Sequence, residues 1–142
     1  MARDFKLPKI LITGTDGQVG FELTRTLAPL GKVIALVRAD LDLSDAAAIQ
    51  AVLDTHQPDI IVNPAAYTAV DKAESDADAA HAVNAQAAGA IARWASAHGA
   101  MVFHYSTDYV FDGTKSGAYV ESDPIAPQSV YGASKAQGEQ LV

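Results

Sequence analysis

The feature that most constrains the fold of this chain is a regular alternation of short apolar runs with longer segments of helical spacing. Apolar runs occur at residues 9–14, 32–37, 59–66 and 101–107. Short runs of this kind are typical of strands that are buried on both faces of a parallel sheet. The intervening segments are long enough to hold the helices that connect parallel strands. The alternation therefore predicts a sheet of parallel strands linked by helices.

Helices are expected where apolar side chains recur at helical spacing, at 22–30, 42–57, 73–98 and 129–142. Ser44 and Asp45 are the candidate N-cap residues of the second of these helices. Residues 108–128 are rich in Gly, Pro, Ser and Asp, and we expect them to form a loop. The whole pattern predicts an α/β protein with a Rossmann-like, doubly wound parallel sheet and helices on both faces. Neither an internal repeat nor a linker interrupts residues 1–142, so they are expected to form one domain.

Composition narrows the possible functions. The 142 residues include no cysteine, which excludes disulfides, thiolate metal sites and cysteine nucleophiles. The formal net charge of −7 argues against a nucleic-acid partner. No apolar run approaches the roughly 20 residues needed to span a bilayer, so we expect a cytoplasmic protein without membrane contact. The four histidines are scattered without the spacing of metal ligands, and no metal-binding residue is assigned.

The segment "ITGTDGQVG" places Gly14, Gly17 and Gly20 three residues apart, after an expected strand and before an expected helix. Glycines at such a turn let backbone N–H groups approach a pyrophosphate, and the N-terminus of the following helix adds partial positive charge. The spacing differs by one residue from the commonest dinucleotide fingerprint. The alternative interpretation is a glycine-rich turn that binds no ligand.

The ends of the second and third apolar runs carry further candidates, because ligands in such sheets bind beyond the carboxyl ends of the strands. Arg38 follows the second run and could hold the 2′-phosphate of NADP, although an exposed surface arginine is an equal alternative. Asp40 or Asp42 could accept a hydrogen bond from an adenine amine. Ala65 and Ala66 end the third run and are small enough to let backbone lie against a cofactor, or they serve close packing alone.

Tyr131 and Lys135 stand four residues apart in "VYGASK", which places them on one face of the last expected helix. An ammonium group beside a phenol favours the phenolate, so such a tyrosine can give or take a proton. Ser106 and Thr107 end the fourth apolar run, where a hydroxyl can hold a substrate oxygen by a hydrogen bond. The Tyr-x-x-x-Lys pattern alone occurs often by chance. Together with the glycine motif and the strand-end hydroxyl, it indicates proton transfer beside a bound dinucleotide.

These motifs together resemble the extended short-chain dehydrogenase/reductase family over nearly the whole chain. The blocks "GTDGQVGFEL", "AVDKAE", "STDYVFDG" and "VYGASK" carry the resemblance, and the second and third are the specific ones. Within the family, they are most similar to reductases of nucleotide-linked 4-ketosugars. The resemblance implies an oxidoreductase that uses NADPH or NADH to reduce the C4 ketone of a sugar nucleotide destined for polysaccharide synthesis.

The resemblance also implies roles for the matched residues. Tyr131 would protonate the C4 oxygen, and Lys135 would bind the nicotinamide ribose and tune Tyr131. Thr107 would orient the substrate carbonyl, with Asp108 also at the substrate. The implied cofactor-binding residues are Gly14, Gly17, Gln18, Val19 and Gly20 at the glycine turn, Arg38, Asp42 and Leu43 after the second strand, Ala65, Ala66 and Tyr67 after the third, and Tyr131 and Lys135.

Departures from the family pattern add further expectations. Val37 stands where some members carry an acid, and with Arg38 this favours NADPH or dual use over NADH alone. Some members bind magnesium at a dimer contact, but no residue of this chain can be assigned to such a site. We expect the protein to form a homodimer or to self-associate. Members are about twice as long as this chain, as suits a cofactor domain joined to a sugar-binding part. We therefore expect residues 1–142 to be an incomplete, N-terminal NAD(P)-binding domain that is inactive alone.

Two alternatives to the reductase stay open. One is a nucleotide-binding regulatory subunit without catalytic activity, since relatives with this fold can serve as partners of other enzymes. The other is an epimerase or dehydratase of the same family, which would share the threonine, tyrosine and lysine. A reductase must release its cofactor after each turnover, whereas an epimerase or dehydratase keeps it.

Overall fold

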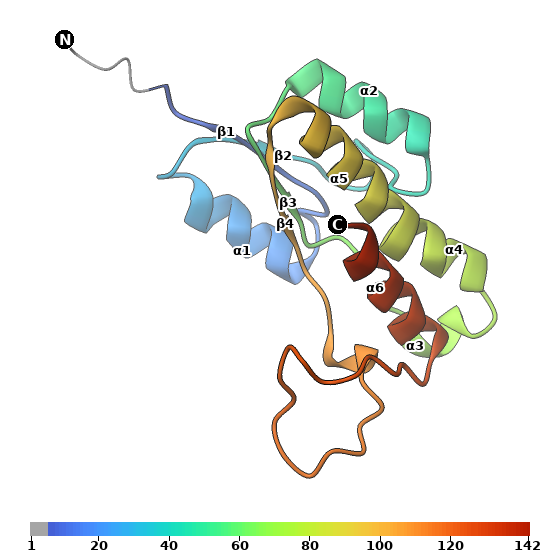
Figure 1. The fold of residues 1–142 in the computed structure, drawn as a ribbon. Helices are drawn as coiled ribbons and strands as arrows, with labels where there is room; N and C mark the ends of the chain where they lie inside the picture. Colours follow the sequence, from blue (N-terminus) through green and yellow to red (C-terminus); the bar gives the residue numbers. More distant parts are fainter. Residues whose placement is uncertain (1–5) are drawn as a thin grey trace.

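The computed structural model describes residues 6–142, and a parallel sheet of four strands forms its centre (Figure 1). The strands are β1 (Lys9–Ile12), β2 (Lys32–Ala35), β3 (Ile60–Asn63) and β4 (Met101–His104). Their order across the sheet is β2-β1-β3-β4, and every neighbouring pair is parallel. The predicted parallel sheet is confirmed. Its strands are shorter than the apolar runs, because each run continues beyond the paired residues into a loop at the carboxyl edge.

The helical elements are α1 (Gln18–Leu27), α2 (Ala46–His56), α3 (Val70–Ala73), α4 (Ala77–His81), the π-helical turn η1 (Ala82–Gln86), α5 (Ala87–His98), the 3₁₀ turn η2 (Asp108–Val110) and α6 (Val130–Leu141). Asp45 is the N-cap of α2, because its carboxylate accepts hydrogen bonds from the N–H groups of Ala47 and Ala48. Ser44 instead donates its hydroxyl to Asp42. The structure thus decides between the two candidate caps.

Two helical regions differ from the sequence prediction. α1 begins at Gln18 rather than at residue 22, because the extended Gly17 (φ −85°, ψ 166°) caps the helix directly after the turn. The single helix expected over 73–98 is broken. The chain leaves helical geometry at Asp76 (φ −135°, ψ 43°) and later passes through the π turn. These breaks create the short α3 and α4, which lie beside α6 (Figure 1).

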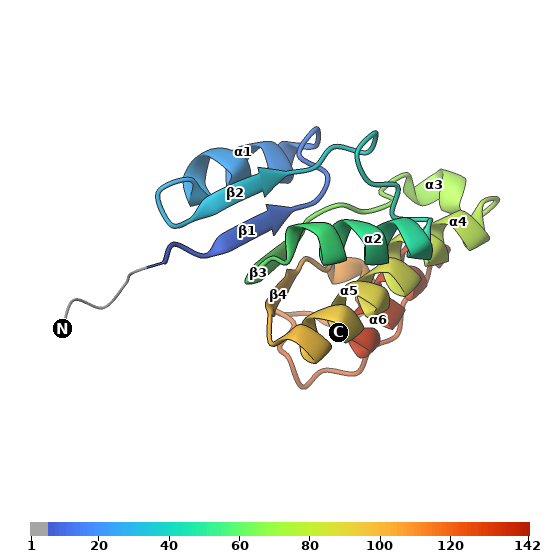
Figure 2. The same cartoon turned by 90° about the horizontal axis from the view of Figure 1, so that it is seen from above.

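Helices cover both faces of the sheet, as predicted (Figure 2). Successive side chains of β1 point to opposite faces, so both faces need apolar cover. α1 packs on one face, where Leu23 and Leu27 meet Ile10, Ile12 and Val62. α2 and α5 pack on the opposite face, whose core includes Leu11, Ile49, Leu53, Ile61, Ile91 and Trp94. α6 packs mainly against α4, η1 and α5.

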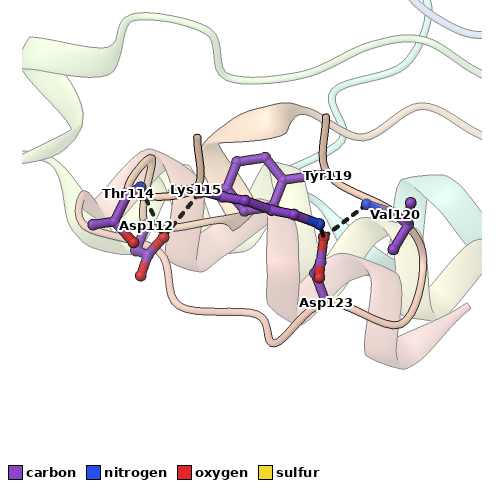
Figure 3. A network of polar contacts seen from close by, with 6 residues as sticks. All are labelled: Asp112, Thr114, Lys115, Tyr119, Val120 and Asp123. Carbon is purple, nitrogen blue, oxygen red and sulfur yellow. Dashed lines mark hydrogen bonds and ion pairs between the residues drawn. The ribbon is translucent and has the colours of Figure 1, made fainter. Parts of the chain in front are cut away.

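The expected loop after β4 is irregular but internally bonded (Figure 3). Lys115 pairs with Asp123 at 2.5 Å between Nζ and Oδ2, and the same oxygen accepts the N–H of Val120. Tyr119 donates its hydroxyl to Asp112 at 2.9 Å. The hydrogen bond from Lys115, followed by that from the Val120 N–H, lowers the pKa of Asp123. The loop is therefore held by its own side chains.

β4 forms one edge of the described sheet and carries exposed apolar side chains. Met101 and Phe103 are 56% and 51% exposed. Exposed apolar groups at a sheet edge favour association with another chain. Self-association of this protein stays a prediction. No helix within residues 6–142 is both long enough and apolar enough to cross a membrane.

Candidate functional site

A cavity of about 650 Å³ opens at the carboxyl ends of β1, β2 and β3. This is the place where open α/β sheets bind ligands. Ten of the residues predicted to bind the cofactor line this cavity: Gly14, Gly17, Gln18, Val19, Arg38, Asp42, Leu43, Ala65, Ala66 and Tyr67. The fold thus gathers residues from three separate loops around one space, and the remaining candidates lie elsewhere.

The glycine turn explains why small residues are needed at the floor of the cavity. Gly14 adopts a left-handed conformation (φ +57°), and a Cβ there would lie 2.8 Å from the Cβ of Ala65. Gly20 does not line the cavity. A Cβ at Gly20 would lie 2.2 Å from the carbonyl oxygen of Gly14, so this glycine allows α1 to close onto the turn. Gly20 therefore shapes the site through packing.

The loop after β2 contributes a cation and an anion to the cavity wall. Asp42 accepts hydrogen bonds through Oδ1 from the backbone N–H and the hydroxyl of Ser44, at 2.9 Å and 2.7 Å. These bonds lower the pKa of Asp42, and the charge of Arg38 adds to the effect. Asp40 does not line the cavity, and its carboxylate accepts the N–H of Val37. Of the two predicted aspartates, only Asp42 is placed to meet a ligand in this cavity.

Lys72 and Asp76 also line the cavity, and the sequence analysis missed both. Tyr67 donates its hydroxyl to Oδ2 of Asp76 at 3.0 Å, and Nζ of Lys72 lies 3.9 Å from the same oxygen. Burial raises the pKa of Tyr67, with a further contribution from Asp76. The four-residue spacing of Lys72 and Asp76 gave no usable signal, because α3 ends at Ala73 and the chain leaves helical geometry at Asp76.

Thr107 belongs to the short segment that follows β4, and Tyr131 and Lys135 contact that segment from α6. The Thr107 hydroxyl accepts the N–H of Tyr109 at 3.3 Å and donates to Asp108 at 3.2 Å. The Tyr131 ring meets the Tyr109 ring edge-on, with centroids 5.5 Å apart. Within residues 6–142, none of the three predicted catalytic side chains hydrogen-bonds another. None of them lines the large cavity either.

Lys135 is the one of these three that lies deepest in the protein. Its side chain is 3% exposed, and Nζ donates to the carbonyl oxygen of Tyr105. Burial lowers the pKa of Lys135, and the nearby Glu139 acts in the opposite direction. Burial also lowers the pKa of His104 to about 4, helped by the charge of Lys135. His104 is therefore neutral at neutral pH. Its Nδ1 lies 3.2 Å from Nδ2 of Asn63.

Asn84 in the π turn joins the large cavity to the helix that carries Tyr131. Its side chain accepts the N–H of Tyr67 at 2.8 Å and donates to the Tyr67 carbonyl and to the Ser134 hydroxyl. Ser134 in turn donates to the carbonyl oxygen of Tyr131 at 2.7 Å. The sequence analysis missed Asn84. The available signal was a polar residue within an alanine-rich stretch expected to pack in the core.

A second cavity of about 340 Å³ lies between η2 and the loop that follows it. It is lined by Asp108, Tyr109, Phe111, Asp112, Gly113, Tyr119, Gln128 and Ser129. Phe111 and Tyr119 stack with ring centroids 4.3 Å apart and form an aromatic wall. Asp108, which was predicted to contact the substrate, thus faces a different cavity from the predicted cofactor residues. Thr107 is absent from the lining of both.

The parallel sheet, the glycine turn at its carboxyl edge and the cavity above that turn define a Rossmann-like α/β domain. The chain belongs to the family described as RmlD substrate binding domain, which matches residues 8–142. This family assignment agrees with the resemblance inferred from the sequence blocks and is narrower than the extended short-chain dehydrogenase/reductase family.

Several relatives of this chain are reductases. A dTDP-4-dehydrorhamnose reductase of Burkholderia thailandensis is 52% identical over 134 residues, which cover 94% of this chain and 45% of the relative. The enzyme of the same name from Escherichia coli is 47% identical over 94% of this chain and 46% of its own length. A crystal structure of dTDP-4-dehydrorhamnose reductase from Bacillus anthracis in complex with NADP matches with a TM-score of 0.92 and 37% identity, over 99% of this chain and 50% of that one. The chain spans about half the length of these relatives.

Proposed function

We propose that this chain is the cofactor-binding part of a dTDP-4-dehydrorhamnose reductase. Such an enzyme uses NADPH to reduce the C4 ketone of dTDP-4-dehydro-L-rhamnose, which gives dTDP-L-rhamnose. The observation that carries the proposal is a cavity at the carboxyl edge of the sheet, lined by ten of the residues predicted to bind the cofactor. The proposed substrate is taken from the names of the similar reductases.

The lining of the large cavity suits a phosphorylated dinucleotide. Small residues at Gly14 and Gly17 leave room for a pyrophosphate, and the N-terminus of α1 directs partial positive charge at it. Arg38 would hold a 2′-phosphate, and Asp42 with Leu43 would hold the adenine. Residues 1–142 would then act as one NAD(P)-binding domain with a preference for NADPH.

The proposed chemistry divides between the cofactor and the protein. Bound NADPH supplies the hydride for C4. The hydroxyl of Tyr131 gives its proton to the ketone oxygen, so that an alcohol forms, and the charge of Lys135 stabilises the phenolate that is left. Thr107 and Asp108 hold the substrate, and the hydroxyl of Thr107 orients the carbonyl. The contacts of Tyr131 and Lys135 with residues 105–109, the segment to which Thr107 belongs, support this arrangement.

The test is a turnover assay of the protein expressed from its full coding sequence. We expect oxidation of NADPH only when dTDP-4-dehydro-L-rhamnose is present, with dTDP-L-rhamnose as the product. NADPH binding without ketosugar reduction would overturn the proposal and favour the regulatory subunit. Retention of the cofactor through turnover would favour an epimerase or dehydratase instead.

The 142-residue chain alone should bind NADPH without turning it over. A cytoplasmic location, a homodimer and the absence of a metal-binding residue stay predictions.

A further inference from the structure

The first turn of α6 is held from outside by a residue far away in the sequence. Val130 donates its N–H to Oε1 of Glu74 at 2.8 Å, across 56 residues of chain. Ser129 caps the same helix by accepting the N–H of Gly132 at 3.1 Å. The first N–H groups of a helix have no partner within the helix, so each needs an acceptor from elsewhere. Glu74 supplies one of these acceptors.

Glu74 also supplies the negative charge that the start of α6 lacks. The first turn of α6 contains no acidic residue. A carboxylate at a helix N-terminus is favourable, because the helix dipole places partial positive charge there. Tyr131 is the residue directly after Val130, so the hydrogen bond to Glu74 is made one residue before the predicted proton donor.

The same turn is also packed against η2. A Cβ at Gly132 would lie 2.3 Å from the carbonyl oxygen of Tyr109 and 3.1 Å from the Cβ of Pro127. The Tyr131 ring contacts the Tyr109 ring in an edge-on geometry. The first turn of α6 is therefore contacted by both Glu74 and η2. The position of Tyr131 depends on both contacts.

The segment that carries Glu74 also forms one wall of the large cavity. Lys72 and Asp76 line that cavity, and Glu74 lies between them in sequence. We propose that Glu74 is a positioning residue, which fixes Tyr131 relative to the cofactor cavity by holding the start of α6. This role rests on the proposed function, in which Tyr131 gives its proton to the substrate carbonyl.

Kinetics of the full protein test the proposal through three variants. Glu74→Ala removes the acceptor, Glu74→Gln keeps an amide oxygen in its place, and Glu121→Ala removes a comparable exposed glutamate from the loop. We expect Glu74→Ala to lower kcat about fivefold and to leave KM for NADPH within about twofold, because the cavity lining is unchanged. Glu74→Gln should keep more than about half of kcat, and Glu121→Ala should match the wild type. Equal kcat in Glu74→Ala and the wild type would overturn the proposal.

Hydrogen exchange provides a second readout that does not depend on turnover. The Val130 amide should exchange about tenfold faster in Glu74→Ala than in the wild type, and about as slowly in Glu74→Gln as in the wild type. Unchanged exchange in Glu74→Ala would overturn the contact itself. If the wild type reduces no ketosugar, the proposed function fails, while the exchange rates still decide whether Glu74 holds α6. If Glu74→Ala does not fold, Glu74→Asp takes its place, because its shorter side chain withdraws the acceptor, and unchanged exchange of the Val130 amide in Glu74→Asp would overturn the contact.

Discussion

The two parts of the candidate site are built in different ways. The large cavity is shaped mainly by backbone and small residues, with Gly14, Gly20 and Ala65 packed closely beneath it. The segment around Tyr131 and Lys135 is instead held by hydrogen bonds from distant side chains, above all Asn84 and Glu74. Substitutions at the tightly packed glycines should therefore disturb the cavity directly, although Asn84 also holds the cavity wall at Tyr67. The comparison predicts that binding and chemistry can be damaged separately.

The largest effect is expected from Tyr131→Phe, which removes the proposed proton donor. General acid catalysis contributes about 10²- to 10⁴-fold, so kcat should fall by that factor. The affinity for NADPH should stay within about twofold, because Tyr131 does not line the large cavity. The assay is steady-state turnover together with NADPH titration. Tyr105→Phe is the matched control and should leave both quantities unchanged. Near-normal turnover in Tyr131→Phe would contradict its assignment.

Gly20→Ala should instead weaken NADPH binding and lower the stability of the protein. The added methyl group would clash with the backbone of Gly14, so the free energy of unfolding should fall by about 3 kcal/mol. NADPH affinity should fall at least about tenfold, because the glycine turn can no longer close. Urea unfolding and NADPH titration measure the two effects. Gly117→Ala is the control, since a Cβ there meets nothing within 4 Å. Unaltered affinity in Gly20→Ala would show that the turn does not shape the cavity.

A smaller effect is expected on the pH dependence of stability, through His104 near Lys135. His104 has a pKa of about 4 in the folded protein, below the ordinary 6.5. Between these values the unfolded chain binds a proton that the folded protein does not, so stability is complete above pH 6.5 and is lost as pH falls. The loss between pH 7 and pH 5 should be about 2 kcal/mol by linkage.

His104→Gln tests this linkage by removing the titrating group. Urea unfolding at pH 7 and at pH 5 gives the acid-induced loss of stability for the wild type and for the variant. The loss should be smaller in His104→Gln, even if the variant is less stable at both pH values. An equal loss in both proteins would assign the pH dependence to other groups.

The smallest effect is expected from Arg38→Ala, which tests how one side chain of the large cavity contributes to the choice between NADPH and NADH. If Arg38 holds a 2′-phosphate, the Kd for NADPH should rise about tenfold, while the Kd for NADH changes less than about twofold. Titration with both nucleotides measures the difference. Arg25→Ala removes an exposed arginine on α1 that pairs with Glu22, and serves as the control for charge. Equal weakening of both cofactors by Arg38→Ala would contradict the 2′-phosphate contact.

Local sequence patterns were enough to predict the backbone-built part of the site. The glycine spacing, the apolar runs and the small Ala65 and Ala66 act over a few residues, and the parallel sheet brings their loops together. The start of α1 was missed, because the extended Gly17 lets the helix begin directly after the turn. The break at Asp76 and the π turn were missed as well, because an alanine-rich stretch has high helix propensity throughout.

The side-chain-built part could be predicted only as a list of residues. The Tyr-x-x-x-Lys spacing indicated the pair, but the bond of Lys135 to the Tyr105 carbonyl depends on how α6 packs. The contact of Glu74 with Val130 and that of Asn84 with Ser134 join residues at least 50 positions apart. No periodicity in one sequence encodes such a pair, since each partner is an ordinary polar residue by itself.

The bonded loop of residues 112–123 has a consequence for how this protein resists proteases. Lys115 is a site of the kind that trypsin cleaves, and exposed loop tips are where such enzymes usually cut. A protease must first draw the chain into an extended shape, and here that requires releasing the Lys115–Asp123 ion pair and the hydrogen bond from Tyr119 to Asp112 (Figure 3). Nicking at Lys115 should therefore be slow at neutral pH and should speed up once Asp123 is neutralised by substitution.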